Sequence, residues 1–131
     1  MMASTLELLR AAQAGGYAVG AFNVYNLEGA LAVVAAAEQE RCPAILQIHP
    51  AALVHGGSPL VALCLEAARR ATVPMAVHLD HCTDLETVRA VLAAGLTSVM
   101  ADGSRLDYEG NVAFTAEVAA MVHARGGCVE A

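Results

Sequence analysis

The sequence predicts an α/β protein built on a parallel β-sheet. Short apolar segments alternate with longer helical segments along the 131 residues, as they do in consecutive βα units. The apolar segments carry few polar residues, so both faces of each strand are expected to be covered, which is typical of parallel strands. The segments begin about 22–31 residues apart, which matches one strand plus one crossover helix.

The first predicted helix follows Ser4, whose spacing from Glu7 matches a capping box. Its apolar positions continue until Gly15-Gly16, where glycine ends the helix. The largely apolar segment 18–24 then predicts the first buried strand. The chain therefore opens with a helix that precedes the first βα unit.

Two further helices and the second strand come next. Asn26 can cap a helix over residues 27–41, and the apolar residues 44–48 predict a strand. Ser58 is followed by proline, which is favoured at the first position of a helix. We therefore expect the next helix over residues 59–71.

The third βα unit begins with the apolar residues 75–79, which predict a strand. Thr83 and Glu86 have the spacing of a second capping box. The helix that they introduce is expected over residues 84–94, where Gly95 closes it.

The last part of the chain repeats the pattern once more. Residues 97–101 predict a strand, after which the chain turns away at Asp102–Ser104. A helix that opens at or near Asn111 is expected over residues 112–125, and residues 128–131 predict a fifth strand.

Charge and composition exclude several classes of function. Seven basic residues stand against 13 acidic ones, a net charge of −6, which argues against nucleic acid and anionic membranes as partners. All seven basic residues are arginines, so no Schiff base with a carbonyl substrate can form, because that chemistry needs a lysine amine. Any carbon–carbon bond chemistry in this chain would have to be metal-based.

Hydropathy predicts a folded, cytoplasmic protein. The hydrophobic fraction of 57% is too high for a disordered chain. Polar residues, glycine or proline interrupt each apolar run well before the ~18 residues of a membrane span, and the N-terminus lacks a basic signal region. The four cysteines show no CxxC pair and are expected to be reduced thiols: Cys42, Cys64, Cys82 and Cys128.

Polar residues gather where the predicted strands end. The carboxyl ends of parallel strands meet at one rim of the sheet, where such proteins place their sites. The opposite rim is much less polar. The residues expected at the carboxyl-end rim are Asn23, His49, Asp80, His81, Asp102 and Ser104.

The densest group of these lies in Val77–His81, which holds two imidazoles and a carboxylate. Such ligands suit a Zn²⁺ ion, although one strand cannot supply the three protein ligands of a catalytic zinc site. His78 and Asp80 share a face of the strand. Two interpretations stay open: a metal centre, or a core histidine at His78 with a supporting carboxylate at Asp80.

Four segments, in this order and spacing, resemble the class II, zinc-dependent ketose-bisphosphate aldolases. They are Ala21–Gly29 (AFNVYNLEG), Ile45–Gln47 (ILQ), His78–His81 (HLDH) and Ser98–Ser104 (SVMADGS). Val129–Ala131 resembles the start of the next motif, which the family continues with Glu-Leu-Gly. The resemblance covers practically the whole chain.

The resemblance implies a TIM barrel, which typically needs ~250 residues. We therefore expect residues 1–131 to form a single partial domain, a half-barrel that stops after about five strands. The implied reaction is the reversible cleavage of fructose 1,6-bisphosphate, or tagatose bisphosphate, to dihydroxyacetone phosphate and glyceraldehyde 3-phosphate. Zinc would polarise the carbonyl of dihydroxyacetone phosphate and stabilise its enediolate.

The resemblance also implies roles for individual residues. His81 would be a zinc ligand, and Asp80 would be the acid/base that handles the aldehyde oxygen. Asn23 and Ser104 would lie at the substrate, Ser104 together with Asp102 on the metal-side rim. The family's remaining zinc ligands, its general base and its glycine-rich phosphate loops are expected beyond residue 131.

One departure from the family concerns Gly110, which stands where the family usually carries glutamate. Three interpretations of the chain stay open. It is a class II aldolase that acts on a phosphorylated ketose, as a homo-oligomer; or a catalytically incomplete half-barrel that serves as an interaction or structural module and pairs with a missing half; or a flavodoxin-like binding domain with an open sheet.

Overall fold

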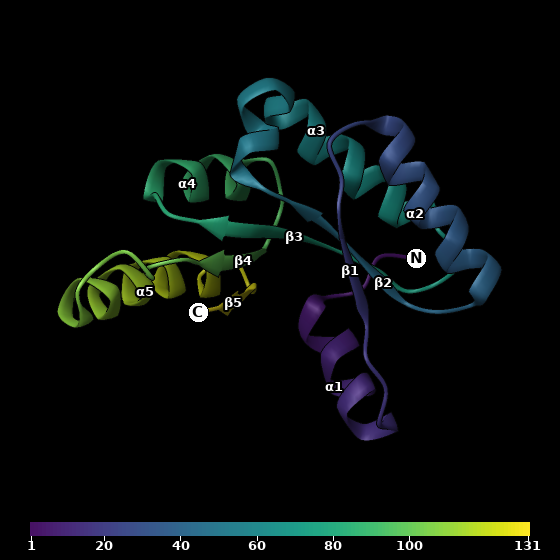
Figure 1. The fold of residues 1–131 in the computed structure, drawn as a ribbon, viewed down its shortest axis with the longest axis horizontal. Coiled ribbons are helices and arrows are strands. Elements are labelled where there is room, and N and C mark those ends of the chain that lie inside the picture. The colour runs from purple at the N-terminus through teal and green to yellow at the C-terminus, as the bar shows by residue number, and fades with distance from the viewer.

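One five-stranded parallel β-sheet organises the fold in a computed structural model that describes residues 1–131 (Figure 1). The strands are β1 (Gly20–Asn23), β2 (Ala44–Ile48), β3 (Met75–Cys82), β4 (Ser98–Ala101) and β5 (Cys128–Glu130). The helices are α1 (Thr5–Gly15), α2 (Leu27–Glu40), α3 (Pro50–Arg70), α4 (Leu85–Ala93) and α5 (Tyr108–His123). The predicted alternation of helices and strands is confirmed.

The strands lie side by side in chain order, β1-β2-β3-β4-β5. A flavodoxin-like domain needs a point at which the strand order reverses, with helices on both faces of the sheet. Here one continuous apolar cluster joins helices α2 to α5 to the same face of the sheet. The flavodoxin-like interpretation is therefore wrong, and the arrangement is that of a half-barrel.

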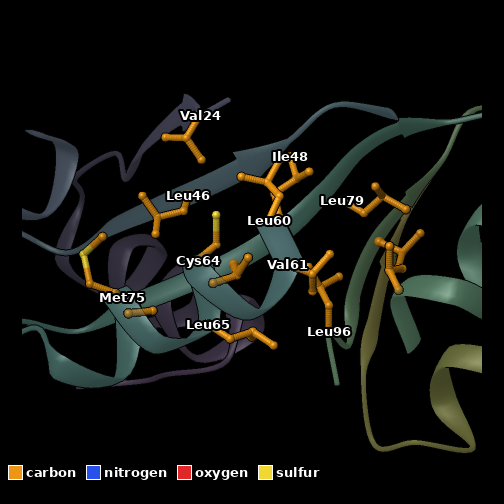
Figure 2. Close-up of a cluster of buried hydrophobic side chains, with 14 of the residues drawn as sticks. Val24, Leu46, Ile48, Leu60, Val61, Cys64, Leu65, Met75, Leu79 and Leu96 are labelled. Carbon is orange, nitrogen blue, oxygen red and sulfur yellow. The ribbon is translucent and has the colours of Figure 1, made fainter. Parts of the chain in front are cut away.

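The main core lies between the sheet and helices α2 to α5. Alternate strand residues such as Leu46, Met75 and Leu79 point into it and are completely buried (Figure 2). They meet Val61 and Cys64, which α3 lays across β2 and β3. Burial of these side chains, at about 25 cal/mol per Å² of apolar surface, is the main force that holds the helices on the sheet.

The opposite face of the sheet, here called the inner face, carries a row of polar residues. Register pairs Asn23 with Gln47, Gln47 with His78, and Ser98 with Cys128. Closer to the amino ends of the strands the inner face is apolar, where Leu8 of α1 packs on Ile45 and Ala76. Helix α1 thus covers the inner face near the amino ends of the strands. The polar row lies closer to the carboxyl ends, where α1 does not cover it.

Helix α3 begins at Pro50, nine residues before the start predicted from the sequence. The Nδ1 atom of His49 caps this first part by accepting the backbone N–H of Ala51 at 3.1 Å. Gly57 then interrupts the helix with φ 49° and ψ −152°, a conformation that only glycine adopts readily. The predicted start at residue 59 is the beginning of the second part.

Two other helix starts differ from the prediction. Helix α4 is capped by Asp84, whose carboxylate accepts the backbone N–H of Thr87 at 2.8 Å, and Thr83 is not the cap. Helix α5 begins at Tyr108, well before residue 112, because Asp107 caps it by accepting the backbone N–H of Gly110 at 2.8 Å. In both cases aspartate, a strong capping residue, sets the boundary.

Helix α3 is the one helix that is long and apolar enough to cross a membrane by length and composition. This qualifies the expectation that each apolar run is too short. Its Leu60, Leu65 and Ala68 are buried against the sheet, and the core helix of a sheet protein passes the same test.

Candidate active site at the carboxyl ends of the strands

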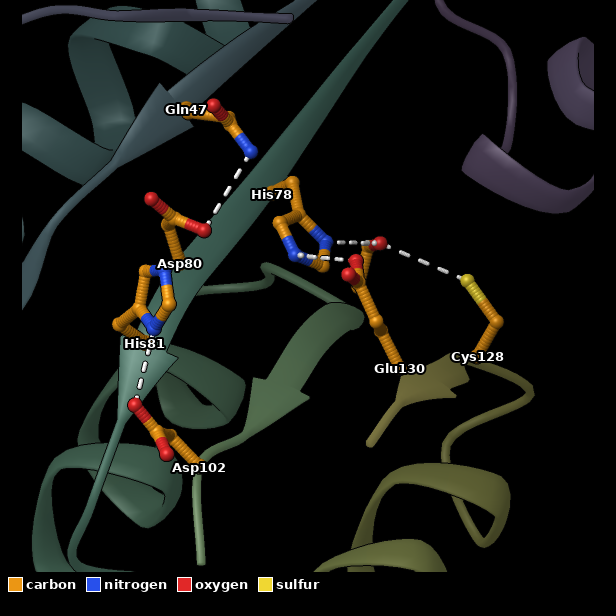
Figure 3. A network of polar contacts seen from close by, with 8 residues as sticks. Gln47, His78, Asp80, His81, Asp102, Cys128 and Glu130 are labelled. Carbon is orange, nitrogen blue, oxygen red and sulfur yellow. Dashed lines mark hydrogen bonds and ion pairs between the residues drawn. The ribbon is translucent and has the colours of Figure 1, made fainter. Parts of the chain in front are cut away.

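A β-bulge near the end of β3 shapes the candidate site. Leu79 pairs with Val99 and Cys82 with Ala101, so β3 advances three residues while β4 advances two. Within the bulge His81 has φ 47°, in the left-handed region that residues other than glycine seldom adopt. Strained backbone of this kind is concentrated at functional sites. The bulge places the Asp80 carboxylate and the His81 ring next to each other (Figure 3).

His81 is held by Asp102, which follows β4. The His81 Nδ1 atom lies 2.8 Å from Asp102 Oδ2, and Asp102 Oδ1 accepts the backbone N–H of Ser104 at 3.1 Å. Hydrogen bonds from Ser104 and from His81 lower the pKa of Asp102 to about 2, and the hydrogen bond to Asp102, with the charge of Asp80, raises the pKa of His81.

This geometry fixes the tautomer of His81. An ionised carboxylate only accepts hydrogen bonds, so the proton of the neutral His81 ring sits on Nδ1 and the lone pair on Nε2. A carboxylate behind an imidazole is the usual arrangement around metal-ligating histidines, where it orients the ring and raises its basicity. The donor chemistry of His81 therefore fits one ligand position of a metal site.

Asp80 lies on the inner face and is 8% exposed. Gln47 of the neighbouring strand donates a hydrogen bond from Nε2 to Asp80 Oδ1 at 3.4 Å. A carboxylate can accept about four hydrogen bonds, so one long bond leaves most of this capacity for a substrate or a proton.

Behind these residues, His78 is buried in the sheet with 3% exposure. Its Nδ1 atom lies 2.7 Å from Ser98 Oγ, and Ser98 in turn accepts a hydrogen bond from the thiol of Cys128 at 3.4 Å. Burial lowers the pKa of His78, so its ring is neutral around pH 7. His78 lies in the polar row of the inner face, whereas His81 lies at the rim.

The structure brings together three of the four residues that the sequence marked for a role. Asp80 and His81 are adjacent, and Ser104 joins them through Asp102. Asn23 lies at the exposed end of β1, two strands away from β3, and is linked to the others only through its register partner in β2.

Sequence reasoning gave no role to Gln47, Ser98 or Glu130, although each lies in a segment that carries the family resemblance. The period of two along β2, β4 and β5 places all three on the inner face and was the available signal. His49, expected at the rim, lies there with its ring centroid 6.3 Å from that of His81.

Residues 1–131 do not form a complete metal site. No group of three His, Cys, Asp or Glu side chains lies close enough together to hold a metal ion. A catalytic zinc ion needs three protein ligands, and His81 provides one imidazole nitrogen. The donor set of this chain therefore fits a part of such a site.

Fold and site define a (β/α) half-barrel whose polar residues gather at the carboxyl ends of its strands. The model of the class II fructose-bisphosphate aldolase family matches residues 3–131. The chain belongs to this family, which is generally metal-dependent.

Individual relatives agree with this assignment. The fructose-bisphosphate aldolase of Thermus caldophilus is 45% identical over 131 residues, which are 100% of this chain and 43% of the relative. The 6-phospho-5-dehydro-2-deoxy-D-gluconate aldolase of Halalkalibacterium halodurans is 40% identical over 136 residues, 99% of this chain and 46% of the relative. The chain thus spans about half the length of the curated relatives it matches.

A solved structure supports the same fold. The crystal structure of the YdjI aldolase from Escherichia coli K12 matches with a TM-score of 0.92 at 29% identity. The match covers 98% of this chain and 51% of that one. The five strands therefore correspond to about half of an aldolase chain.

Proposed function

We propose that residues 1–131 form one half of the active site of a zinc-dependent ketose-bisphosphate aldolase. The proposed reaction is the reversible cleavage of fructose 1,6-bisphosphate to dihydroxyacetone phosphate and glyceraldehyde 3-phosphate. The observation that carries the proposal is the bulge in β3, which sets the Asp80 carboxylate beside the His81 ring.

In this proposal His81 contributes one zinc ligand through Nε2, and Asp102 keeps the proton on Nδ1 and the ring in place. When bound, the metal would supply Lewis-acid polarisation of the substrate carbonyl. The absence of lysine from this chain agrees with metal-based chemistry, because none of its residues can form an imine with the substrate.

Asp80 is proposed to move a proton to and from the aldehyde oxygen of the substrate. It lies on the inner face, has acceptor capacity to spare and is oriented by Gln47. General acid–base catalysis by a positioned side chain contributes about 10²–10⁴-fold to a rate. Asn23 lies at the end of β1 and Ser104 follows β4. Both are proposed to hold polar groups of the substrate.

The identity of the substrate rests on the relatives. Their names include a fructose-bisphosphate aldolase and a 6-phospho-5-dehydro-2-deoxy-D-gluconate aldolase, so a phosphorylated sugar is the feature common to both. We propose fructose 1,6-bisphosphate first, since it is named for the relative with the higher identity. Tagatose 1,6-bisphosphate and the deoxygluconate phosphate are the comparison substrates.

We also propose that the open edges of the sheet pair with further strands, from another segment or from a second copy. β1 is exposed along its whole length, and Phe22 on this strand is about half exposed. An open edge with apolar neighbours favours association. Analytical ultracentrifugation should show that the 131-residue chain self-associates, and a monomer at high concentration would contradict this proposal.

The activity is tested with the protein itself and with a chimera. In the chimera, residues 1–131 replace the matching segment of the Thermus caldophilus relative, which supplies the rest of the barrel. We expect zinc-dependent cleavage of fructose 1,6-bisphosphate that a chelator abolishes. A chimera that melts cooperatively and binds zinc, yet cleaves none of the three substrates, would contradict the proposal.

A further inference from the structure

The ring of His78 has one nitrogen without a partner. The side chain is 4% exposed, and its Nε2 atom is buried with no hydrogen bond. An unpaired buried polar atom is costly, and native structures seldom leave one unless it has a role. The other nitrogen, Nδ1, is fully engaged with Ser98 Oγ at 2.7 Å.

The neighbours of this hydrogen bond favour one direction. The thiol of Cys128 donates to Ser98 Oγ at 3.4 Å, so the Ser98 hydroxyl is free to donate its own hydrogen to Nδ1 of His78. A neutral imidazole carries one proton, which then lies on Nε2. The chain of donors therefore runs from β5 through β4 to β3 and ends on an Nε2–H group.

That N–H group faces a carboxylate. Oε2 of Glu130, at the end of β5, lies 3.6 Å from Nε2, just beyond hydrogen-bond distance (Figure 3). In the reverse tautomer the Nε2 lone pair would face this negative charge, so the carboxylate favours the tautomer that Ser98 already selects. A movement of the Glu130 side chain by a few tenths of an ångström would complete the bond.

Glu130 lies at the same end of the sheet as the candidate site. Its side chain is 63% exposed at the carboxyl end of β5, in register with Met100 of β4. Its carboxylate lies beside His78 in the polar row of the inner face (Figure 3).

We infer that His78 is a positioning residue whose Nε2–H holds the Glu130 carboxylate on the inner face, at the carboxyl end of the sheet. Ser98 and Cys128 set the ring's tautomer, and Glu130 adds a third carboxylate, besides Asp80 and Asp102, at this end of the sheet. In the aldolase reaction, a role that rests on the proposed function, Glu130 would orient a substrate hydroxyl or a water molecule.

The test is ¹⁵N NMR of the ring nitrogens in the labelled 131-residue protein, a readout that needs neither metal nor substrate. We expect His78 in one tautomer, with Nδ1 unprotonated and Nε2 protonated. Glu130→Gln should shift the Nε2–H resonance and speed its exchange with water about tenfold. Glu117→Gln, which removes an exposed carboxylate from α5, is the matched control and should leave the resonance unchanged.

Ser98→Ala provides the second arm. Without the hydroxyl, Nδ1 loses its donor and both tautomers should become populated. An Nδ1–H tautomer in the unmodified protein would overturn the inference, as would a response to Glu130→Gln no larger than that to Glu117→Gln. Because no activity is measured, this result is independent of whether the chimera cleaves fructose 1,6-bisphosphate.

Discussion

Nδ1 of His81 lies 2.8 Å from Oδ2 of Asp102, and this contact ties the bulge of β3 to the turn that follows β4. It holds the His81 ring, 51% exposed, in one orientation at the rim of the sheet. The contact also fixes which nitrogen carries the proton. The remaining nitrogen, Nε2, is then ready to bind a ligand without rearrangement.

The contact between His81 and Asp102 should stabilise the fold only over a limited range of pH. The raised pKa of His81 means that its charged form is favoured below the ordinary value of 6.5, and this contribution disappears as pH rises through the raised value. The lowered pKa of Asp102 means that its contribution is present above 3.8 and disappears as pH falls through about 2. The ion pair is therefore fully formed between roughly pH 4 and 6.5.

Asp102→Asn should lower the pKa of His81 toward its ordinary value, because the neutral amide no longer favours the imidazolium. The measurement is an NMR titration of the His81 ring protons in the metal-free protein. Asp107→Asn, in the cap of α5, is the control and should leave the titration unchanged. An identical His81 titration in Asp102→Asn would contradict the assigned contact.

The left-handed backbone at His81 predicts an unusual order of stabilities. His81→Gly should unfold with a free energy about 1 kcal/mol higher than His81→Ala, because glycine adopts positive φ without steric cost. Urea denaturation of the two variants measures the difference. At Ala35 in α2 the order should be reversed, with Ala35→Gly about 1 kcal/mol less stable than the parent. A more stable His81→Ala would argue against the bulge.

The start of α4 offers a direct choice between two neighbouring residues. Asp84→Ala should lower the free energy of unfolding by about 1 kcal/mol, because the N–H of Thr87 loses its acceptor. Thr83→Ala should change it by less than about 0.5 kcal/mol, since Thr83 is exposed and caps nothing. Thermal and urea unfolding decide between them, and a larger loss for Thr83→Ala would restore the capping box that the sequence predicts.

A cavity in the main core should lower the stability of the protein. Leu46→Ala should lower the free energy of unfolding by about 2–5 kcal/mol, because Leu46 is fully buried between β2 and the helices. Leu31→Ala, on the half-exposed face of α2, is the matched control and should cost less than about 0.5 kcal/mol. Equal losses in urea denaturation would mean that the helices do not pack on the sheet as described.

The positions of the strands were predictable because their signal is local, although β3 runs to Cys82, three residues beyond its predicted end, and so includes Asp80 and His81. Residues 44–48 were placed without error, since a short apolar run between a proline and a polar rim allows few alternatives. Helix starts were less certain wherever two capping residues are neighbours, as Thr83 and Asp84 are. The early start of α3 was missed for two reasons. Histidine is a weak capping residue, and Gly57 and Pro59 suggest that a new helix begins there.

In the candidate site, too, some features could be predicted from the sequence and others could not. Asp80 and His81 stood out in the sequence because Val77–His81 holds two imidazoles and a carboxylate at the end of a predicted strand. Their relation to Asp102 depends on the bulge, and no propensity predicts a histidine with positive φ. The contacts of Gln47 and Glu130 depend on the register between strands, which the sequence of one chain does not specify.

The most direct measurement compares Asp80→Asn and Asp107→Asn in the chimera with the Thermus caldophilus relative. We expect Asp80→Asn to lower kcat for cleavage of fructose 1,6-bisphosphate by at least about 10²-fold while the zinc content stays the same. Asp107→Asn should retain the parent activity. If Asp80→Asn cleaves the substrate as fast as the parent, the site at the end of β3 is not the proton-transfer site of an aldolase.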